Sequence, residues 1–241
     1  MSKTVVIDYL AESVRNYGSA DALVAIDVMR ATTTAVTCVA LGRSCFPVPS
    51  VEAALALAAE LTNPLLIGEV GGFMPPGFHL NNSPVDLTQR SDVERPVILV
   101  SSSGTGLMCA GGEGQPMFVA CLRNYSAQVA YLASHHERVA VIGAGTKGEF
   151  REEDALCCAW IADGLLKAGF EVENASTAAL IERWRGAPVE AICASASAEY
   201  LRRTHQVRDL DFILAHIDDL DEVFSVEGSQ VVRPSAELLP R

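Results

Sequence analysis

Short apolar runs alternate with helical stretches along most of the chain. Strands are predicted over residues 4–7, 23–26, 45–48, 64–67, 97–100, 117–120 and 138–142. Helices are predicted over residues 31–41, 51–61, 105–109, 126–134 and from 152 to about 168, with Gly169 beyond the last of them. Because strands that alternate with helices are typical of parallel sheets, the pattern predicts an α/β fold with helices on both faces of a mostly parallel sheet.

The pattern changes beyond Gly169. Another helix is predicted over residues 177–185, and one helical face then collects apolar side chains from Val189 to Tyr200. The C-terminal third, about 170–241, is therefore expected to be mainly helical and packed on the sheet, with an edge strand near 223–226. No repeat or long linker divides the sequence, so residues 1–241 are expected to form a single domain.

Charge narrows the classes of partner. The chain has 30 acidic and 18 basic residues, a formal net charge of -12, which argues against binding to nucleic acid or to an anionic membrane. An anionic substrate would need local arginines, helix N-termini and a metal ion. The seven cysteines form no CxxC pair and show no zinc-ligand spacing with histidine. The first apolar run is broken at Asp8, which argues against a signal peptide, and no apolar segment is long enough to span a bilayer. We therefore expect a cytoplasmic protein with reduced thiols.

The segment after the second predicted strand has the strongest chemical signal. Asp27 ends a buried strand, at the edge of the sheet where α/β proteins bind ligands. Its carboxylate can bind a metal or act as a nucleophile, and Arg30 can clamp a phosphate with two hydrogen bonds. Helix-start amides and the hydroxyls of Thr32, Thr33 and Thr34 complete a phosphate cradle. An isolated aspartate here would usually only cap the helix, but the cluster favours a site.

Two further loops follow strands 64–67 and 97–100. The first is long and rich in glycine and proline, and it offers Glu69 as a metal ligand and Asn82 and Ser83 as polar contacts. A loop of this length inside an α/β domain is usually functional, although a surface loop of glycine turns is the alternative. The second loop, through Gly104 and Thr105, allows close approach of an anion to backbone amides, a weak signal by itself.

The segment after strand 138–142 permits two interpretations. Gly143, Gly145 and Gly148 match the dinucleotide fingerprint GxGxxG, which makes an NAD(P)-binding oxidoreductase one alternative. In that fold, however, the helix begins within the glycine run, whereas here four residues intervene. The other interpretation makes 145–148 a phosphate-facing turn and places the acids at 149, 153 and 154 near the metal. First-turn acids that only complement the helix dipole are the structural alternative for at least one of them.

Taken in order, these segments resemble the 2-phosphosulfolactate phosphatase family, the ComB-like proteins. The matching pieces are Asp27 to Thr34, Gly68-Glu69, Gly77-Phe78, Asn82-Ser83-Pro84, Gly104-Thr105, Asn124, Ala144-Gly145-Thr146, Gly148-Glu149-Phe150 and Glu153 to Cys157. They cover about 23–161, with a looser match beyond. The sequence departs from the family at Ser103, where an asparagine is usual, and near 208–212, where a common glycine is missing.

The resemblance implies a three-layer α/β/α fold and Mg²⁺-dependent hydrolysis of a small acidic phosphate monoester. The family's substrate is 2-phospho-3-sulfolactate, an intermediate on a route to coenzyme M. We expect Asp27, Glu69 and Asp154 to hold the ion directly or through water, with Glu153 beside them. Arg30 would neutralise phosphoryl charge. The other expected contacts are Thr32, Thr33, Thr34, Asn82, Ser83, Ser103, Gly104, Thr105, Asn124, Gly145, Thr146 and Glu149.

Several alternatives stay open at this point. Attack by metal-bound water is the first expectation, and a phosphoaspartate at Asp27 is the second. A non-catalytic anion-binding protein would keep the Arg and Thr residues but would not need so many strand-end acids. The expected partner is a small anionic phosphate ester, with neither nucleic acid nor membrane, and a homodimer is the candidate assembly.

Overall fold

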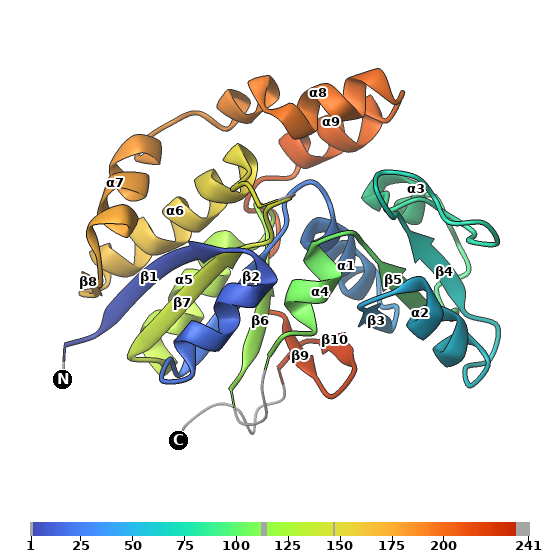
Figure 1. Ribbon diagram of the computed structural model, residues 1–241, viewed down its shortest axis with the longest axis horizontal. Coiled ribbons are helices and arrows are strands. Elements are labelled where there is room, and N and C mark those ends of the chain that lie inside the picture. The colour runs from blue at the N-terminus through green and yellow to red at the C-terminus, as the bar shows by residue number, and fades with distance from the viewer. Residues whose placement is uncertain (1, 112–114, 147, 235–241) are drawn as a thin grey trace.

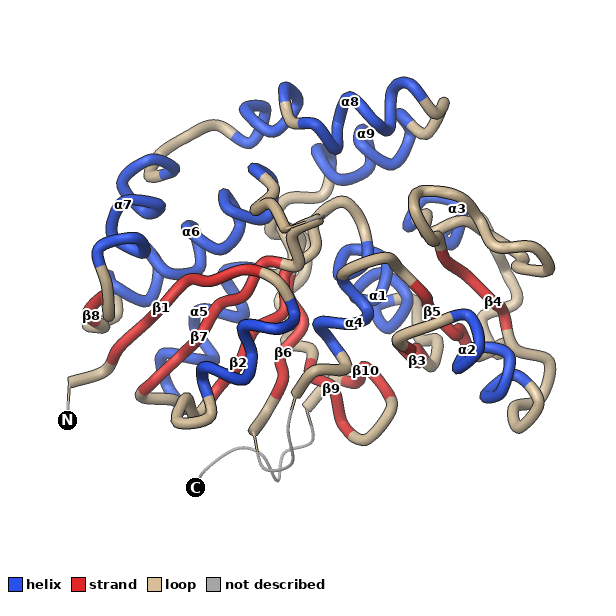
Figure 2. Tube along the Cα trace, viewed as in Figure 1, coloured by secondary structure: helices blue, strands red, loops and turns tan. Residues whose placement is uncertain are grey.

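The computed structural model describes residues 2–111, 115–146 and 148–234. Within them, ten strands form a single sheet in the order β4-β5-β3-β10-β9-β6-β2-β7-β1-β8, with helices on both faces (Figures 1 and 2). The strands are β1 Thr4–Tyr9, β2 Ala22–Ile26, β3 Cys45–Val48, β4 Leu65–Gly68, β5 Val97–Val100, β6 Met117–Ala120, β7 Arg138–Gly143, β8 Glu171–Val172, β9 Ser225–Glu227 and β10 Gln230–Val232. The predicted α/β class and its three layers are confirmed.

The helices alternate with the strands as predicted. They are α1 Ala31–Ala40, α2 Val51–Ala58, α3 Pro84–Thr88, α4 Gly104–Met108, α5 Tyr125–His135, α6 Glu152–Lys167, α7 Ala175–Trp184, α8 Ala196–Arg203 and α9 Val207–Ala215, with 3-10 helices η1 Ala11–Tyr17 and η2 Val189–Ala194. The apolar face predicted from Val189 to Tyr200 is divided between η2 and α8, because Ser195 ends one and caps the other by accepting a hydrogen bond from the Ala198 amide.

Alternate residues of the fully buried strand β2 face two separate cores. Leu23 and Ala25 pack with α1 and α4, whereas Val24 and Ile26 pack with α6 on the other face. Such an unbroken apolar strand is typical of a sheet covered on both sides. The cores hold β2 rigidly, and its carboxyl end therefore presents Asp27 at a fixed position.

The strand near 223–226 does not lie at an edge of the sheet. β9 and β10 form an antiparallel hairpin through Gly228, whose φ of +60° suits a glycine turn. β10 pairs with β3 and β9 pairs with β6, so the hairpin joins two parallel groups of strands in the middle of the sheet. The prediction of an edge strand is therefore wrong in position: Phe224 and Val231 are buried on the sheet, and the C-terminal third contributes strands as well as helices.

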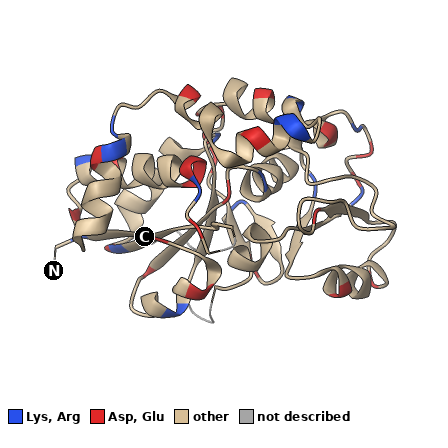
Figure 3. Ribbon diagram, turned by 45° about the horizontal axis from the view of Figure 1, so that its top comes forward, with Lys and Arg blue, Asp and Glu red and all other residues tan. Residues whose placement is uncertain are grey.

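Helices η2, α8 and α9, residues 189–215, form a cap over the carboxyl ends of the central strands (Figure 1). α8 contacts α9, and α9 contacts α3. In the view of Figure 3, basic segments are scattered among acidic ones along the helices. Within the described part of the chain, no helix is both long and apolar enough to cross a membrane.

Candidate active site

A cavity of about 400 Å³ lies between the carboxyl ends of the strands and the cap. The loops after β2, β4, β5 and β7 form its floor and sides, and the first turns of α8 form its roof. Four acidic side chains and two arginines line it: Asp27, Glu69, Glu153, Asp154, Arg30 and Arg151. The structure therefore brings together the four acids that the sequence predicts, from three separate segments.

Three of these acids are buried beside one another. Burial raises the pKa of Asp27 to about 7, helped by the negative charges of Glu69 and Glu153 and opposed by the Ala31 amide and Arg30. Burial also raises the pKa of Asp154 well above its usual value, and Asp27 and Glu153 add to the effect. Asp154 is held by the Val28 amide, which donates to it at 2.8 Å. Burial and mutual repulsion therefore favour the protonated forms of Asp27 and Asp154, and a bound cation would favour their charged forms instead.

The chemistry of the cavity suits a hard cation. Glu153 Oε2 and Asn82 Oδ1 are buried without a hydrogen-bond partner. Two oxygen atoms of the cavity wall can therefore still accept a hydrogen bond or bind a cation, in the same cavity as Asp27 and Asp154. No three His, Cys, Asp or Glu side chains among the described residues already converge on one metal position. Mg²⁺ does not require such a cage, because it keeps several waters and takes one or two carboxylates. The residues present therefore fit Mg²⁺.

Glu69 joins two loops of the wall. Its carboxylate accepts hydrogen bonds from the Gly72 amide at 2.7 Å, from the Ser102 amide at 2.7 Å and from the Ser102 hydroxyl at 2.8 Å. The loop that carries Gly72 also receives the Tyr200 hydroxyl, which donates to the Gly72 carbonyl at 2.5 Å. Glu69 therefore fixes the wall of the cavity, and direct binding of a metal by it stays a prediction.

Arg30 is buried and paired with a residue that the sequence did not indicate. Its Nη1 forms an ion pair with Asp209 of α9 and donates to Gln206 Oε1 at 2.6 Å. Asp209 also accepts from the Ser83 hydroxyl at 2.6 Å. Asp209 belongs to an otherwise ordinary amphipathic helix, so no pattern in the sequence marks it. This network holds Arg30 at the cavity and attaches the cap to the sheet.

Several predicted phosphate contacts lie outside the cavity wall. The Thr32 hydroxyl bonds to the backbone of Asp27 and the Thr33 hydroxyl to Val28. Hydroxyls in a first helical turn commonly satisfy neighbouring backbone groups in this way. The remaining residues of this kind are Thr34, buried without a partner, Ser83, which caps α3, Thr105, bonded to Ser101, Asn124, bonded to Cys121, and Glu149, largely exposed.

The other predicted contacts do line the cavity. Asn82, Ser103, Gly145 and Thr146 are part of its wall. Gly104 packs directly against Asp27. Arg151, Ser197 and Tyr200 also line the cavity but were not predicted, because α8 carries no motif and Arg151 lies between the matching pieces that end at Phe150 and begin at Glu153.

Gly104→Ala is expected to displace the Asp27 carboxylate. A Cβ at position 104 would lie 2.2 Å from Asp27 Oδ2 and 2.6 Å from the Ala31 Cβ, which no relaxed structure allows. Misplacement of a reacting group by about 1 Å can cost roughly 100-fold in rate, and we expect a loss of that order in kcat/KM. Gly106→Ala in the same helix is the matched control, since a Cβ there meets nothing within 4 Å. Equal activities of the two variants would contradict this placement of Asp27.

The glycine run after β7 forms a tight turn. The backbones of Thr146 and Glu149 pair with each other, and α6 begins only at Glu152. A Cβ on Gly143 would strike the Phe150 ring at 2.3 Å, and a Cβ on Gly145 would lie 2.7 Å from the Glu149 carbonyl. These glycines therefore allow the turn to pack on itself and on Phe150. They do not open a helix, as a dinucleotide fingerprint requires.

Comparison with known proteins agrees with this geometry. The sequence profile of the 2-phosphosulpholactate phosphatase family matches residues 9–228. A protein of Deinococcus radiodurans named probable 2-phosphosulfolactate phosphatase is 35% identical over 197 residues, which cover 80% of this chain and 82% of that protein. A protein of the same name from Synechococcus sp. is 32% identical over 90% of this chain and 94% of its own length. Another, from Thermus thermophilus, is 33% identical over 80% of this chain and 82% of its own length. This chain therefore belongs to the 2-phosphosulfolactate phosphatase family.

Proposed function

We propose that the protein is a Mg²⁺-dependent phosphatase that hydrolyses 2-phospho-3-sulfolactate to 3-sulfolactate and phosphate. The observation that carries this proposal is the buried group Asp27, Glu153 and Asp154, a set of neighbouring carboxyl groups that a bound cation would hold in their charged forms. The names of the relatives support the same substrate. A protein that only bound anions would gain nothing from three buried acids, because they repel its ligand.

Five residues of the cavity have a part in the proposed reaction. Asp27, Glu153 and Asp154 would hold Mg²⁺ directly or through water, and the ion would supply positive charge to the phosphoryl oxygens. Arg30, fixed by Asp209, adds a planar cation at the same end of the cavity. Tyr200 of the roof formed by α8 donates a hydrogen bond to the Gly72 loop, so the roof would stay in place over the bound substrate.

Asp27 is suited to proton transfer. In the metal-free protein, burial raises the pKa of Asp27 to about 7. A direct bond to the cation would lower this pKa, so Asp27 would take up the proton of an attacking water only if it holds the ion through water. Nucleophilic attack by Asp27 itself, with a phosphoaspartate intermediate, is the alternative. Both routes require the Asp27 carboxylate at the position that Gly104 leaves open.

The proposed location of the protein is the cytoplasm. All seven cysteines are free, and five of them are buried, which agrees with a reducing compartment. The homodimer remains a prediction.

The proposal is tested by phosphate release from 2-phosphosulfolactate, 2-phospholactate and simple alkyl phosphates, in Mg²⁺ and in EDTA. We expect release from the acidic esters in Mg²⁺ and its loss in EDTA, with recovery when Mg²⁺ is restored. Failure of the folded protein to release phosphate from any ester in Mg²⁺ would exclude the phosphatase function. NADH titration against protein fluorescence tests the oxidoreductase alternative, for which we expect no saturable binding.

A further inference from the structure

Arg151 is a cation in the cavity wall whose charge has little compensation from the protein. It lies directly before α6, two residues before Glu153. Its Nε is buried and has no hydrogen-bond partner. Its ion-pair contact is with Glu149, from Nη1 to Oε2 at 3.6 Å, which is longer than a hydrogen bond. A buried guanidinium N–H without an acceptor is costly, so this position calls for an acceptor that the protein does not supply.

The two arginines of the cavity are therefore different. Arg30 has 3% of its side chain exposed, and Asp209 and Gln206 occupy its Nη1. Arg151 has 20% exposed, and its partner Glu149 has 74% exposed, so the carboxylate of Glu149 can move into solvent when a better acceptor arrives. Of the basic residues that the structure describes along the cavity, Arg151 is the one with capacity to bind a further anion.

The anion in question is not the phosphate alone. In the proposed reaction the phosphoryl group lies at the acids and their cation, near Asp27 and Asp154. The proposed substrate carries two further acid groups, a carboxylate and a sulfonate, and neither can lie against Glu69 or Glu153 without strong repulsion. A planar guanidinium with free N–H groups fits an oxyanion of either kind, because it donates two parallel hydrogen bonds.

We propose that Arg151 forms a second anion subsite, which binds a carboxylate or sulfonate of the substrate and makes the enzyme selective for phosphate esters of acids. This inference rests on the proposed phosphatase function for its substrate, but the subsite itself is a property of Arg151 and the cavity. The fixed start of α6 and the stacking of Phe150 on Tyr9, with ring centroids 5.0 Å apart, hold the backbone beside Arg151. The subsite is therefore at a defined position in the cavity.

The test compares Arg151→Ala and Arg151→Lys with the wild type on three esters in Mg²⁺. These are 2-phosphosulfolactate, 2-phospholactate, which lacks the sulfonate, and isopropyl phosphate, which lacks both acids. We expect Arg151→Ala to lower kcat/KM for 2-phosphosulfolactate by roughly 10- to 100-fold, the value of a charge-assisted contact, and to leave isopropyl phosphate within about 2-fold. The kcat/KM of Arg151→Lys for 2-phosphosulfolactate should lie between those of Arg151→Ala and the wild type. If Arg151→Ala also lowers kcat/KM for 2-phospholactate, Arg151 binds the carboxylate of the substrate. If only the rate on 2-phosphosulfolactate falls, Arg151 binds the sulfonate.

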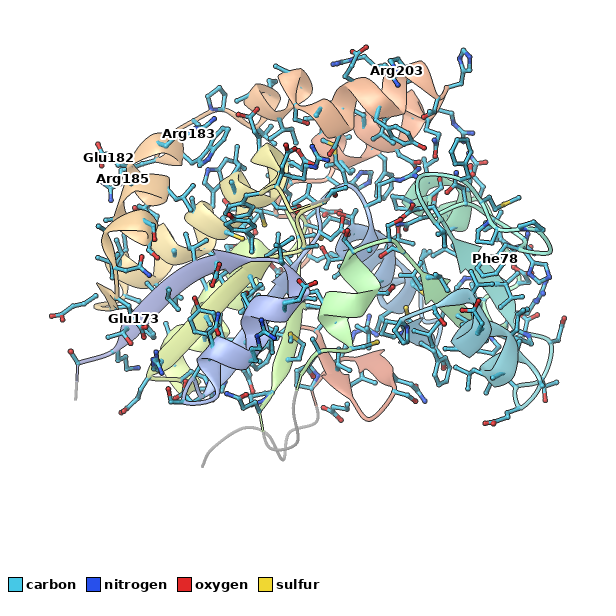
Figure 4. The ribbon with its side chains drawn as sticks, in the orientation of Figure 1. Phe78, Glu173, Glu182, Arg183, Arg185 and Arg203 are labelled. Atoms are coloured by element: carbon cyan, nitrogen blue, oxygen red, sulfur yellow. The ribbon has the colours of Figure 1, made fainter. Side chains whose placement is uncertain are left out.

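Arg203→Ala is the matched control. Arg203 lies at the outer surface of α8 (Figure 4) and outside the cavity wall, so this variant changes the net charge equally and should change none of the three rates. An equal loss on all three esters in Arg151→Ala would overturn the proposal, because Arg151 would then act on the phosphate or on the fold. Unchanged rates on all three would also overturn it.

Equilibrium binding separates this inference from the proposed function. Calorimetric titration of 3-sulfolactate and of isopropanol into the intact protein in Mg²⁺ needs no turnover. We expect Arg151→Ala to weaken binding of 3-sulfolactate by roughly 10-fold or more. If no ester is hydrolysed by the wild type, the phosphatase proposal fails. The subsite then stands if 3-sulfolactate binding depends on Arg151, and fails if the wild type and Arg151→Ala bind it equally.

Discussion

Asp27→Asn is expected to lower kcat/KM for phosphate release by at least about 1,000-fold while the protein stays folded. The amide keeps the size of the side chain but removes the negative charge that would hold the cation and the base or nucleophile that the reaction needs. Steady-state phosphate release in saturating Mg²⁺ measures the loss. Asp211→Asn, an exposed position in α9, is the control for the change in charge and should retain full activity.

The same substitution is expected to stabilise the protein when metal is removed. Because burial raises the pKa of Asp27 from 3.8 to about 7, the folded state binds its proton more tightly than the unfolded state does. The free energy of unfolding of the wild type therefore falls as pH rises between these two values. In EDTA, Asp27→Asn should raise the Tm more at about pH 8 than at about pH 5. A lower Tm than wild type at the higher pH, or unchanged turnover, would contradict the role assigned to Asp27.

Asp209→Asn is expected to cost about 3–5 kcal/mol of unfolding free energy, because it leaves the buried Arg30 guanidinium without its ion-pair partner. For a chain of this length that corresponds to a fall in Tm of roughly 10 °C. Denaturant unfolding and thermal scans measure it directly. Activity should fall as well, since Arg30 loses the partner that fixes it at the cavity.

Asp211→Asn, two residues along the same helix and exposed, should leave the Tm nearly unchanged. Removing both charges, as in Arg30→Met with Asp209→Leu, should recover much of the stability but not the activity. This separation distinguishes the structural cost of an unpaired charge from the catalytic use of Arg30. A Tm for Asp209→Asn equal to that of Asp211→Asn would show that the buried pair is not what holds the cap.

The sequence was sufficient for the parallel strands β1 to β7 and for the floor of the cavity. Apolar runs of four or five residues between turns identify buried strands such as β3, β5 and β6 almost to the residue. Asp27 and Glu69 directly follow such strands. Because parallel strands share their direction, both acids must lie on the side of the sheet where the carboxyl ends of the strands meet. Local pattern and chain direction together therefore predict the four acids of the cavity.

The remaining parts depend on contacts between distant segments, which no local pattern encodes. Asp209 meets Arg30 only because α9 folds back over α3, and α8 forms the roof only because the chain returns across the site. The threonines at the start of α1 lie outside the cavity wall for a different reason. A hydroxyl near a helix start serves its own backbone as readily as a ligand, and composition does not distinguish the two uses.

The central position of the β9–β10 hairpin determines when the sheet can be completed. During synthesis, every strand from β1 to β8 leaves the ribosome before the hairpin that joins β3 to β6. Until residues 225–232 emerge, the nascent protein has two half-sheets with open edges facing each other, the kind of edge that recruits foreign strands. A chain that stopped before Ser225 would keep these edges of β3 and β6 unpaired, so the hairpin is the element that closes the sheet.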